Sequence, residues 1–340
     1  MAKTAAKTAP KAAAKKPAPK KAASKATAPR RDVMQEVTDR IVREMEAGAL
    51  PWVKPWRSGG FSGGAVISGL PVNFATNRPY SGINVVLLWS AQQEGQYPTG
   101  QWLTFKQAAE LGGNVRKGER GTPITYFGRV ERKNENDEDV KFGFWKSFTV
   151  FNVAQCENLP ERAPVATVRR TIGNPDQRDE WADAFIASTK ADFREGYGEA
   201  YYATGGDYVS MPAFSRFKNA DNFYATAFHE LGHWTGAEDR LNRKIANRFG
   251  NESYALEELA AELTAAFCCA DFGFDGETRH AGYITHWIKV LREDKNAFAK
   301  AASAASKAFL YLRDLALAEG TEAAPEAAEA PEEAVYALAA

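Results

Sequence analysis

A five-residue run at 229–233, with the sequence HELGH, restricts this chain more than any other feature, and it lies within the apolar segment 223–234. Residues four apart share one face of an α-helix, so His229 and His233 can reach the same metal ion. Glu230 lies beside them and can act on water, as in the HExxH motif. The alternative is a pair of hydrogen-bonded core histidines on a packing helix. Because the chain has only four histidines, a chance match is rare, and we favour the metal site.

A catalytic zinc site needs a third protein ligand and an open position. The helical pattern at 253–272 offers three candidates: Glu257, Glu258 and Glu262. We predict Glu258 as the ligand and Glu262 as the carboxylate that orients a histidine, with Glu262 as the alternative ligand. A solvated acidic helix face is the competing interpretation. His280 and His286 are further alternatives, although both lie on polar or aromatic segments.

The expected ion is Zn²⁺, with Mn²⁺ or another divalent ion as the alternative, and Glu230 is the expected general base. Upstream of the motif, residues 201–212 have the pattern of two short strands around a turn. A strand edge beside a metal cleft can hold an extended peptide by adding a strand. A hairpin with core tyrosines explains the same pattern.

Charge is unevenly distributed, although the formal net charge is zero. Residues 1–31 carry eight Lys and two Arg without an acid, and residues 319–340 carry six Glu without a base. The body between them is mildly acidic, so any basic surface on it must be local. The basic tail is of a kind that binds nucleic acid or membranes, or only keeps a protein in solution. Both tails contain little to bury, and we predict that they are disordered.

Cysteine usage and hydropathy indicate the compartment. Three cysteines without a CxxC spacing favour a reducing environment and no disulfide framework. No window has the apolar length needed to cross a membrane. The basic start lacks the apolar core of a secretory signal. We therefore expect a cytoplasmic protein that does not interact with membranes.

The order of helical and β-rich patterns predicts an α+β protein with two domains. The first, residues 32–157, combines helical patterns at 32–47 and 83–93 with two β-rich runs. Those runs cover 123–132 and 142–153, with a hairpin loop at 134–139 between them. Thr104 and Gln107 have the spacing of a capping box, which predicts a short helix after Thr104.

Residues 158–175 contain three prolines and are predicted to be a linker. The second domain, residues 176–318, is predicted to be mostly helical, with one β-rich stretch at 199–211. Its helical patterns cover 176–191, 222–235, 253–272, 277–292 and 296–318.

Aromatic and basic residues alternate through the first domain. They include Trp52, Lys54, Trp56, Arg57, Arg78, Tyr80, Trp102, Phe105, Lys106, Arg116, Lys117 and Arg120. Proteins that bind single strands combine a positive groove with aromatic side chains on which bases stack. A small domain also needs aromatic residues in its core, so the pattern alone leaves both interpretations open.

Short motifs in both halves carry a family resemblance. In the first half they are 51–56 (PWVKPW), 71–73 (PVN), 80–84 (YSGIN), 102–108 (WLTFKQA), 112–119 (GGNVRKGE) and 151–155 (FNVAQ). These resemble the N-terminal domain of ArdC-type antirestriction proteins, which also occurs at the start of some plasmid-encoded primases. In the second half they are Asp207, 211–212, 224–236, 240–241 and 257–262. These resemble the zincin-like metallopeptidase domain that follows in the same family, and together the motifs cover about residues 32–272.

The resemblance implies binding of single-stranded DNA, metal-dependent peptidase chemistry or a remnant of it, and carriage on plasmids or other mobile DNA. The residues predicted to contact DNA are Trp56, Arg78, Tyr80, Asn84, Lys106, Arg116 and Lys117. The first hypothesis is an antirestriction protein that engages incoming single strands and acts on an unknown protein or peptide. The alternatives are a protease for proteins bound or crosslinked to DNA, and a DNA-binding protein whose metal site is only structural. Glu230 argues against the last, because a structural site needs no base.

Overall fold

A computed structural model of the chain describes residues 32–52, 69–133, 139–161, 177–243, 252–274 and 283–318. All its elements belong to the unit that begins at Val33. The two charged tails, most of the linker, and the candidates Trp56 and His280 lie outside the described residues. Among the described residues, none of the helices combines the length and the apolar composition of a membrane span. The mixture of sheets and helices confirms the predicted α+β class.

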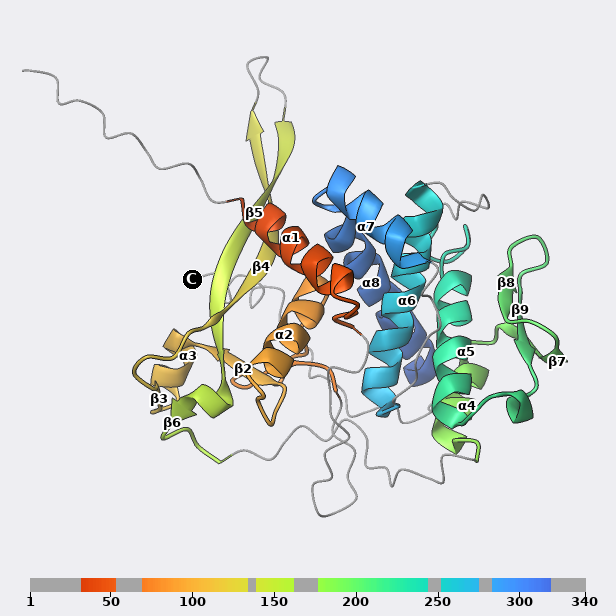
Figure 1. The fold of residues 1–340 in the computed structure, drawn as a ribbon, viewed down its shortest axis with the longest axis horizontal. Helices are drawn as coiled ribbons and strands as arrows, with labels where there is room; N and C mark the ends of the chain where they lie inside the picture. Colours follow the sequence, from red (N-terminus) through yellow and green to blue (C-terminus); the bar gives the residue numbers. More distant parts are fainter. Residues whose placement is uncertain are drawn as a thin grey trace, which may run out of the picture. The chain divides into compact units, whose positions relative to one another are not determined.

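The first half is organised around a four-stranded sheet in the order β1-β2-β5-β4. The strands are β1 Val72–Asn73, β2 Gln101–Thr104, β4 Thr122–Lys133 and β5 Asp139–Asn152. β1 runs parallel to β2, and the other pairs are antiparallel. β4 and β5 continue beyond the sheet as a long twisted ribbon (Figure 1). Both strands were expected from their β-rich sequences.

Three helices and a small second sheet complete this half. They are α1 Val33–Glu46, α2 Ile83–Glu94, α3 Phe105–Glu110, and the pair β3 Asn114–Val115 with β6 Cys156–Glu157. A 3₁₀ turn, Val153–Gln155, leads into β6. The predicted capping box is present. The Thr104 side chain accepts from the Gln107 backbone amide, and the Gln107 side chain accepts from the Thr104 backbone amide. This cap fixes where α3 begins.

The second half is mostly helical, as predicted. Its helices are α4 Glu180–Ser188, α5 Ala220–Trp234, α6 Glu252–Phe272, α7 Ile284–Glu293 and α8 Ala297–Ala318, with a 3₁₀ turn at Phe214–Arg216. A three-stranded sheet in the order β7-β9-β8 precedes α5; its strands are β7 Asp192–Tyr197, β8 Tyr201–Ala203 and β9 Tyr208–Pro212. α5 and α6 lie side by side (Figure 1). These two helices carry every candidate metal ligand that was favoured from the sequence.

α2 connects the two halves through opposite faces. Leu88 and Ala91 pack with Trp102 of the sheet, whereas Trp89 belongs to the larger core formed by the helices of the second half. The Trp89 and Phe267 rings meet edge to face, with centroids 5.8 Å apart. A helix that is apolar on all sides needs this two-sided burial.

Polar contacts reinforce the same junction. The Gly82 amide donates to the Ser306 hydroxyl at 2.7 Å, and the Thr38 hydroxyl donates to the Lys295 carbonyl at 2.7 Å. One continuous hydrophobic core therefore runs from α1 and α2 into α6, α7 and α8.

Candidate metal centre

α5 forms because its sequence supplies a capping residue, an apolar face, and a tyrosine whose ring packs against the neighbouring core. The Asn219 side chain accepts from the Asn222 amide at 3.0 Å, which satisfies one of the free donors at the helix start. The Tyr224 ring stacks on Phe274 with centroids 4.9 Å apart. The helix is buried along most of its length and ends at Trp234, so both histidines of the motif lie in its last turns.

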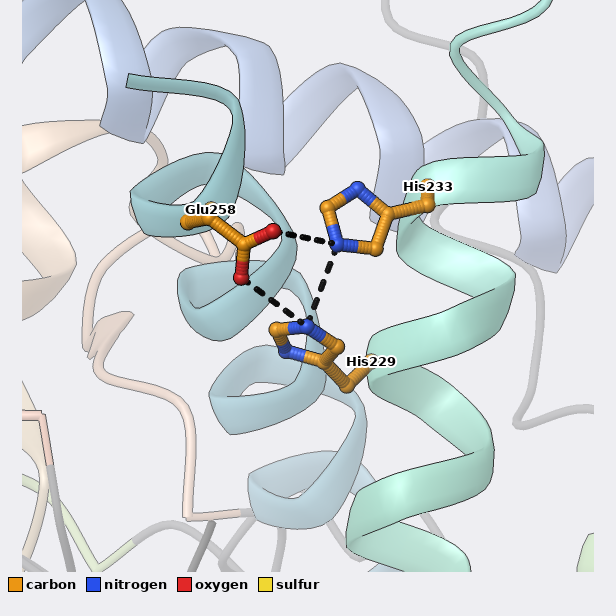
Figure 2. A group of neighbouring side chains, drawn as sticks. All are labelled: His229, His233 and Glu258. Atoms are coloured by element: carbon orange, nitrogen blue, oxygen red, sulfur yellow. Dashed lines mark hydrogen bonds and ion pairs between the residues drawn. The ribbon is translucent and has the colours of Figure 1, made fainter. Parts of the chain in front are cut away.

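His229, His233 and Glu258 converge between α5 and α6 (Figure 2). The Nε2 atoms of the two imidazoles are 3.1 Å apart. Each faces one oxygen of the Glu258 carboxylate, with His229 Nε2 at 3.6 Å from Oε2 and His233 Nε2 at 3.5 Å from Oε1. One donor atom from each residue lies within 4.8 Å of the other two. The three side chains predicted as ligands are therefore aimed at one another.

Burial makes the charges in this cluster costly unless they are balanced. Burial lowers the pKa of His229, but its contacts with Glu258 and Glu262 and the charge of Glu230 outweigh burial and raise the pKa to about 10. Burial raises the pKa of Glu258, but the two histidines and the Tyr254 hydroxyl outweigh that effect and lower it to about 2. The carboxylates around His229 therefore favour its positively charged form.

The Nδ1 atom of each histidine, which points away from Glu258, lies close to a second carboxylate. His229 Nδ1 lies 3.5 Å from Glu262 Oε2, and His233 Nδ1 lies 3.2 Å from Glu257 Oε1. Carboxylates in this position fix the ring orientation and raise the basicity of a ligand histidine. Glu262 therefore occupies the place expected of an orienting residue, and Glu257 occupies the equivalent place for His233.

Arg243 holds Glu257 in position, and no pattern in the sequence points to this role. Its Nη2 and Nε donate to the two Glu257 oxygens at 2.8 and 3.0 Å. The same side chain donates to the Gly232 carbonyl at 2.6 Å and to the Thr235 hydroxyl at 2.7 Å. Burial raises the pKa of Glu257, but His233 and Arg243 outweigh burial and lower it. Arg243 thus joins the end of α5 to the start of α6.

A second arginine ties the segment after α5 to the small sheet. The Arg240 guanidinium donates to both Asp207 oxygens and to the Tyr202 hydroxyl, and Tyr202 donates to Asp207 at 2.8 Å. Arg240 also lies over the Trp234 ring, 4.1 Å from its centroid. This network links Trp234, which directly follows His233, to β8 and the turn before β9.

The donor set fits a divalent metal. Two imidazoles and one carboxylate are the ligands of one established class of catalytic zinc site. Glu230, Glu258 and Glu262 are all buried in the same region, where a divalent cation would offset their charge. His286 lies exposed on α7 and is not part of the cluster.

Comparisons with known proteins agree with this geometry. Residues 31–151 match the family described as the N-terminal domain of the anti-restriction factor ArdC, and residues 180–304 match a zincin-like metallopeptidase family. The crystal structure of the antirestriction ArdC protein from plasmid R388, in its metal-free form, is 39% identical. That match covers 84% of this chain and 98% of the other, with a TM-score of 0.71. The chain belongs to the ArdC antirestriction family.

Other relatives extend the comparison. The Mn(II)-bound structure of the R388 ArdC protein is 37% identical over the same shares of both chains, with a TM-score of 0.70. Protein y4eC of Sinorhizobium fredii is 37% identical, and the match covers 81% of this chain and 90% of that one. A DNA primase TraC of Escherichia coli is 36% identical, but the match spans only 26% of the primase and 80% of this chain.

Three of the predicted DNA contacts in this ArdC-family chain are exposed cations. Lys106 lies on α3, and Arg116 and Lys117 lie in the segment after β3. Lys106 is 3.8 Å from Glu110, and Arg116 is 2.8 Å from Glu119. Such exposed pairs are weak and leave the cations available to phosphates.

Tyr80, Asn84 and Arg78, which were also predicted to contact DNA, have structural partners in this ArdC-family chain. Tyr80 packs against the core, where burial raises its pKa to about 12, and its hydroxyl accepts from the Asn73 amide at 3.3 Å. The Asn84 amide donates to the Thr125 carbonyl and accepts from the Thr125 amide, both at 2.8 Å. Asn84 therefore covers the free backbone of an edge strand. Arg78 is half-buried, and its backbone carbonyl accepts from the backbone amide of Asn73 at 2.8 Å.

Proposed function

We propose that this protein binds single-stranded DNA through residues 32–157 and hydrolyses a peptide bond at the His229, His233 and Glu258 site. In this proposal it protects mobile DNA from restriction. The observation that carries the enzymatic part is the convergence of these three side chains, with Glu230 buried on the same helix as the two histidines. A site that only supports the fold has no use for an additional base.

His229, His233 and Glu258 would hold the metal, for which we propose Zn²⁺, with Mn²⁺ as the alternative. When bound, a divalent metal polarises a carbonyl and lowers the pKa of water. Glu262 and Glu257 hold the two imidazoles in fixed orientations through their Nδ1 atoms. Arg243 in turn keeps Glu257 charged and in place.

Glu230 is the proton carrier in this proposal. Its carboxylate would accept a proton from the attacking water and return it to the amine that leaves. The side chain is buried, which excludes bulk water from competing for that proton. The three-residue network of Arg240, Asp207 and Tyr202 connects the metal helix to β8, an edge strand of its sheet. An edge strand there suits an extended peptide.

The DNA-binding part of the proposal is supported by exposed cations and by the functions of related proteins. The body of the chain is mildly acidic, yet Lys106, Arg116 and Lys117 are exposed in the half that matches the ArdC N-terminal family. Cations of this kind neutralise phosphates and release counterions. A solved relative is an antirestriction protein from plasmid R388, and two sequence relatives are TraC DNA primases of Escherichia coli.

The decisive experiment measures the metal content of the purified full chain together with its affinity for single and double strands. We expect one divalent ion per chain and tighter binding of the single strand at equal salt. Equal affinity for both forms of DNA would remove the basis of the DNA-binding role. An absence of metal after loading with Zn²⁺ and with Mn²⁺ would remove the basis of the peptidase role.

A further inference from the structure

Phe105 is the most exposed large apolar side chain among the described residues, with 61% of its surface accessible. It is the first residue of α3, directly after the capping residue Thr104. The reciprocal bonds between Thr104 and Gln107 fix that turn, and Gln107 also bonds with Asn73. The backbone below the ring is therefore rigid. An exposed aromatic ring on a rigid support loses little conformational entropy when it binds a partner.

The ring also has an aromatic neighbour. Phe151 of β5 meets Phe105 edge to face, with centroids 6.4 Å apart. Gly121 leaves room for this arrangement, because a Cβ at that position would lie 2.9 Å from the Phe151 ring and 2.3 Å from Thr149. The two phenylalanines form a small aromatic shelf, Phe105 and Phe151, of which Phe105 is the open part.

Two exposed cations lie beside Phe105 and beside Gly121 in the sequence. Lys106 follows Phe105 and is 69% exposed, and Arg120 precedes Gly121 and is also exposed. The Arg120 backbone is held in place, since the buried Gln155 side chain donates to its carbonyl at 2.9 Å. Gln155 also donates to Glu119, which pairs with Arg116. The acids in this region, Glu110 and Glu119, are therefore engaged by Lys106 and Arg116.

We infer that the Phe105–Phe151 shelf is a base-stacking platform for single-stranded DNA, with Lys106 and Arg120 placed to contact the adjoining phosphates. A base has an apolar face, and every nucleotide carries a phosphate, so the shelf and its cations match this ligand in both respects. The inference deepens the proposed DNA-binding function and rests on it. It assigns the stacking role to Phe105, whereas Tyr80 is packed into the core.

The test compares the full chain with its Phe105→Ala and Phe105→Trp variants on a fluorescent oligothymidylate and on an abasic strand of the same length. Stacking on an aromatic side chain contributes about 1–3 kcal/mol per base, so Phe105→Ala should weaken oligothymidylate binding about 5- to 150-fold. Phe105→Trp should restore it. The unchanged protein should bind the oligothymidylate more tightly than the abasic strand. This difference in affinity should be smaller in Phe105→Ala, because stacking needs the base.

Two controls make the result specific. Trp181→Ala removes another exposed aromatic ring, 43% accessible on α4, and should leave DNA affinity unchanged. The salt slope of Phe105→Ala should equal that of the unchanged protein, whereas Arg120→Ala should reduce it. If the unchanged protein does not bind the oligothymidylate, the proposed function fails. If it binds and Phe105→Ala binds equally well, only this inference fails.

Discussion

Gly232 of α5 lies against Ala261 of α6 so closely that a Cβ on Gly232 would be 3.1 Å from the Ala261 Cα. It would also lie 3.3 Å from the Ala261 carbonyl oxygen. The glycine in the HELGH run therefore lets the backbones of the two metal-site helices approach each other. This contact determines how far His229 and His233 stand from Glu258.

Gly232→Ala tests that contact. In an ordinary helix interior, replacing Gly with Ala stabilises the protein by about 0.5–1 kcal/mol. Here the new methyl group meets backbone atoms, so we expect destabilisation of about 1–3 kcal/mol and weaker metal binding. Thermal unfolding and metal titration measure the two effects. Gly198→Ala is the matched control, because nothing lies within 4 Å of its Cβ position. A more stable Gly232→Ala variant with normal metal affinity contradicts the close-approach argument.

The ion pair between Arg243 and Glu257 leads to a second prediction. Arg243→Lys keeps the positive charge but cannot contact both Glu257 oxygens, Gly232 and Thr235 together. Since Glu257 orients His233, we expect metal affinity to fall about 10- to 100-fold, the usual cost of losing such support. Competition with a chelator measures it.

Arg178→Lys provides the control for that substitution. Arg178 also contacts two carboxylates, those of Asp183 and Glu195, but it belongs to the segment before α4. Its replacement should leave metal affinity unchanged. Equal metal affinity in the Arg243→Lys variant and the unchanged protein would show that His233 does not need this support.

The carboxylates of α6 have distinct expected roles. His229→Ala and Glu258→Ala each remove a proposed ligand and should abolish stoichiometric metal. Glu262→Gln removes only the charge behind His229 and should weaken binding about 10- to 100-fold without abolishing it. Metal analysis of the purified variants checks the order. If Glu262→Gln loses the metal and Glu258→Ala keeps it, the site stands but the two assignments are exchanged.

Sequence patterns predicted α5 and α6 well, because the residue spacing that indicates a helix is a local property of the sequence. The spacing of His229 and His233 identifies one helix face, and the pattern at 253–272 nearly coincides with α6. Arg243 lies beyond the end of α5, and its role depends on a carboxylate from the next helix. Such a tertiary contact has no periodic signature. The same holds for Asn84, whose motif position gives no hint that it covers Thr125.

β7 was missed for a related reason. Its residues are almost all exposed, so the sequence shows no alternation of apolar and polar side chains. The strand forms because β9 pairs with it in parallel, and β9 comes later in the chain. β8 and β9 were predicted because they follow each other around a short turn.

DNA affinity provides the fourth prediction. Replacing Arg116 and Lys117 with alanine should weaken single-strand binding and make it less sensitive to salt. Each phosphate contact contributes a slope of about 0.7 in log affinity against log salt for single strands, so the slope should fall by up to about 1.4. Binding titrations at several salt concentrations measure this. An unchanged slope would place the phosphate contacts elsewhere on the chain.

The last prediction separates binding from catalysis through Glu230→Gln. Glutamine keeps the size and helix preference of glutamate but cannot accept the proton, and it leaves His229, His233 and Glu258 in place. We expect peptide cleavage to disappear while metal content and DNA affinity persist. Metal analysis, DNA titration and a cleavage assay on the same preparation check these three outcomes.

A restriction assay on that same variant distinguishes two ways of protecting DNA. If coating of the single strand is sufficient, Glu230→Gln should still protect, because the residues proposed to contact DNA lie in the other half of the chain. We expect protection to survive. Loss of protection with normal folding, metal content and DNA affinity would show that cleavage of a peptide bond is what defeats restriction. The coating role would then be secondary, and the search for the substrate would turn to proteins that meet the incoming strand.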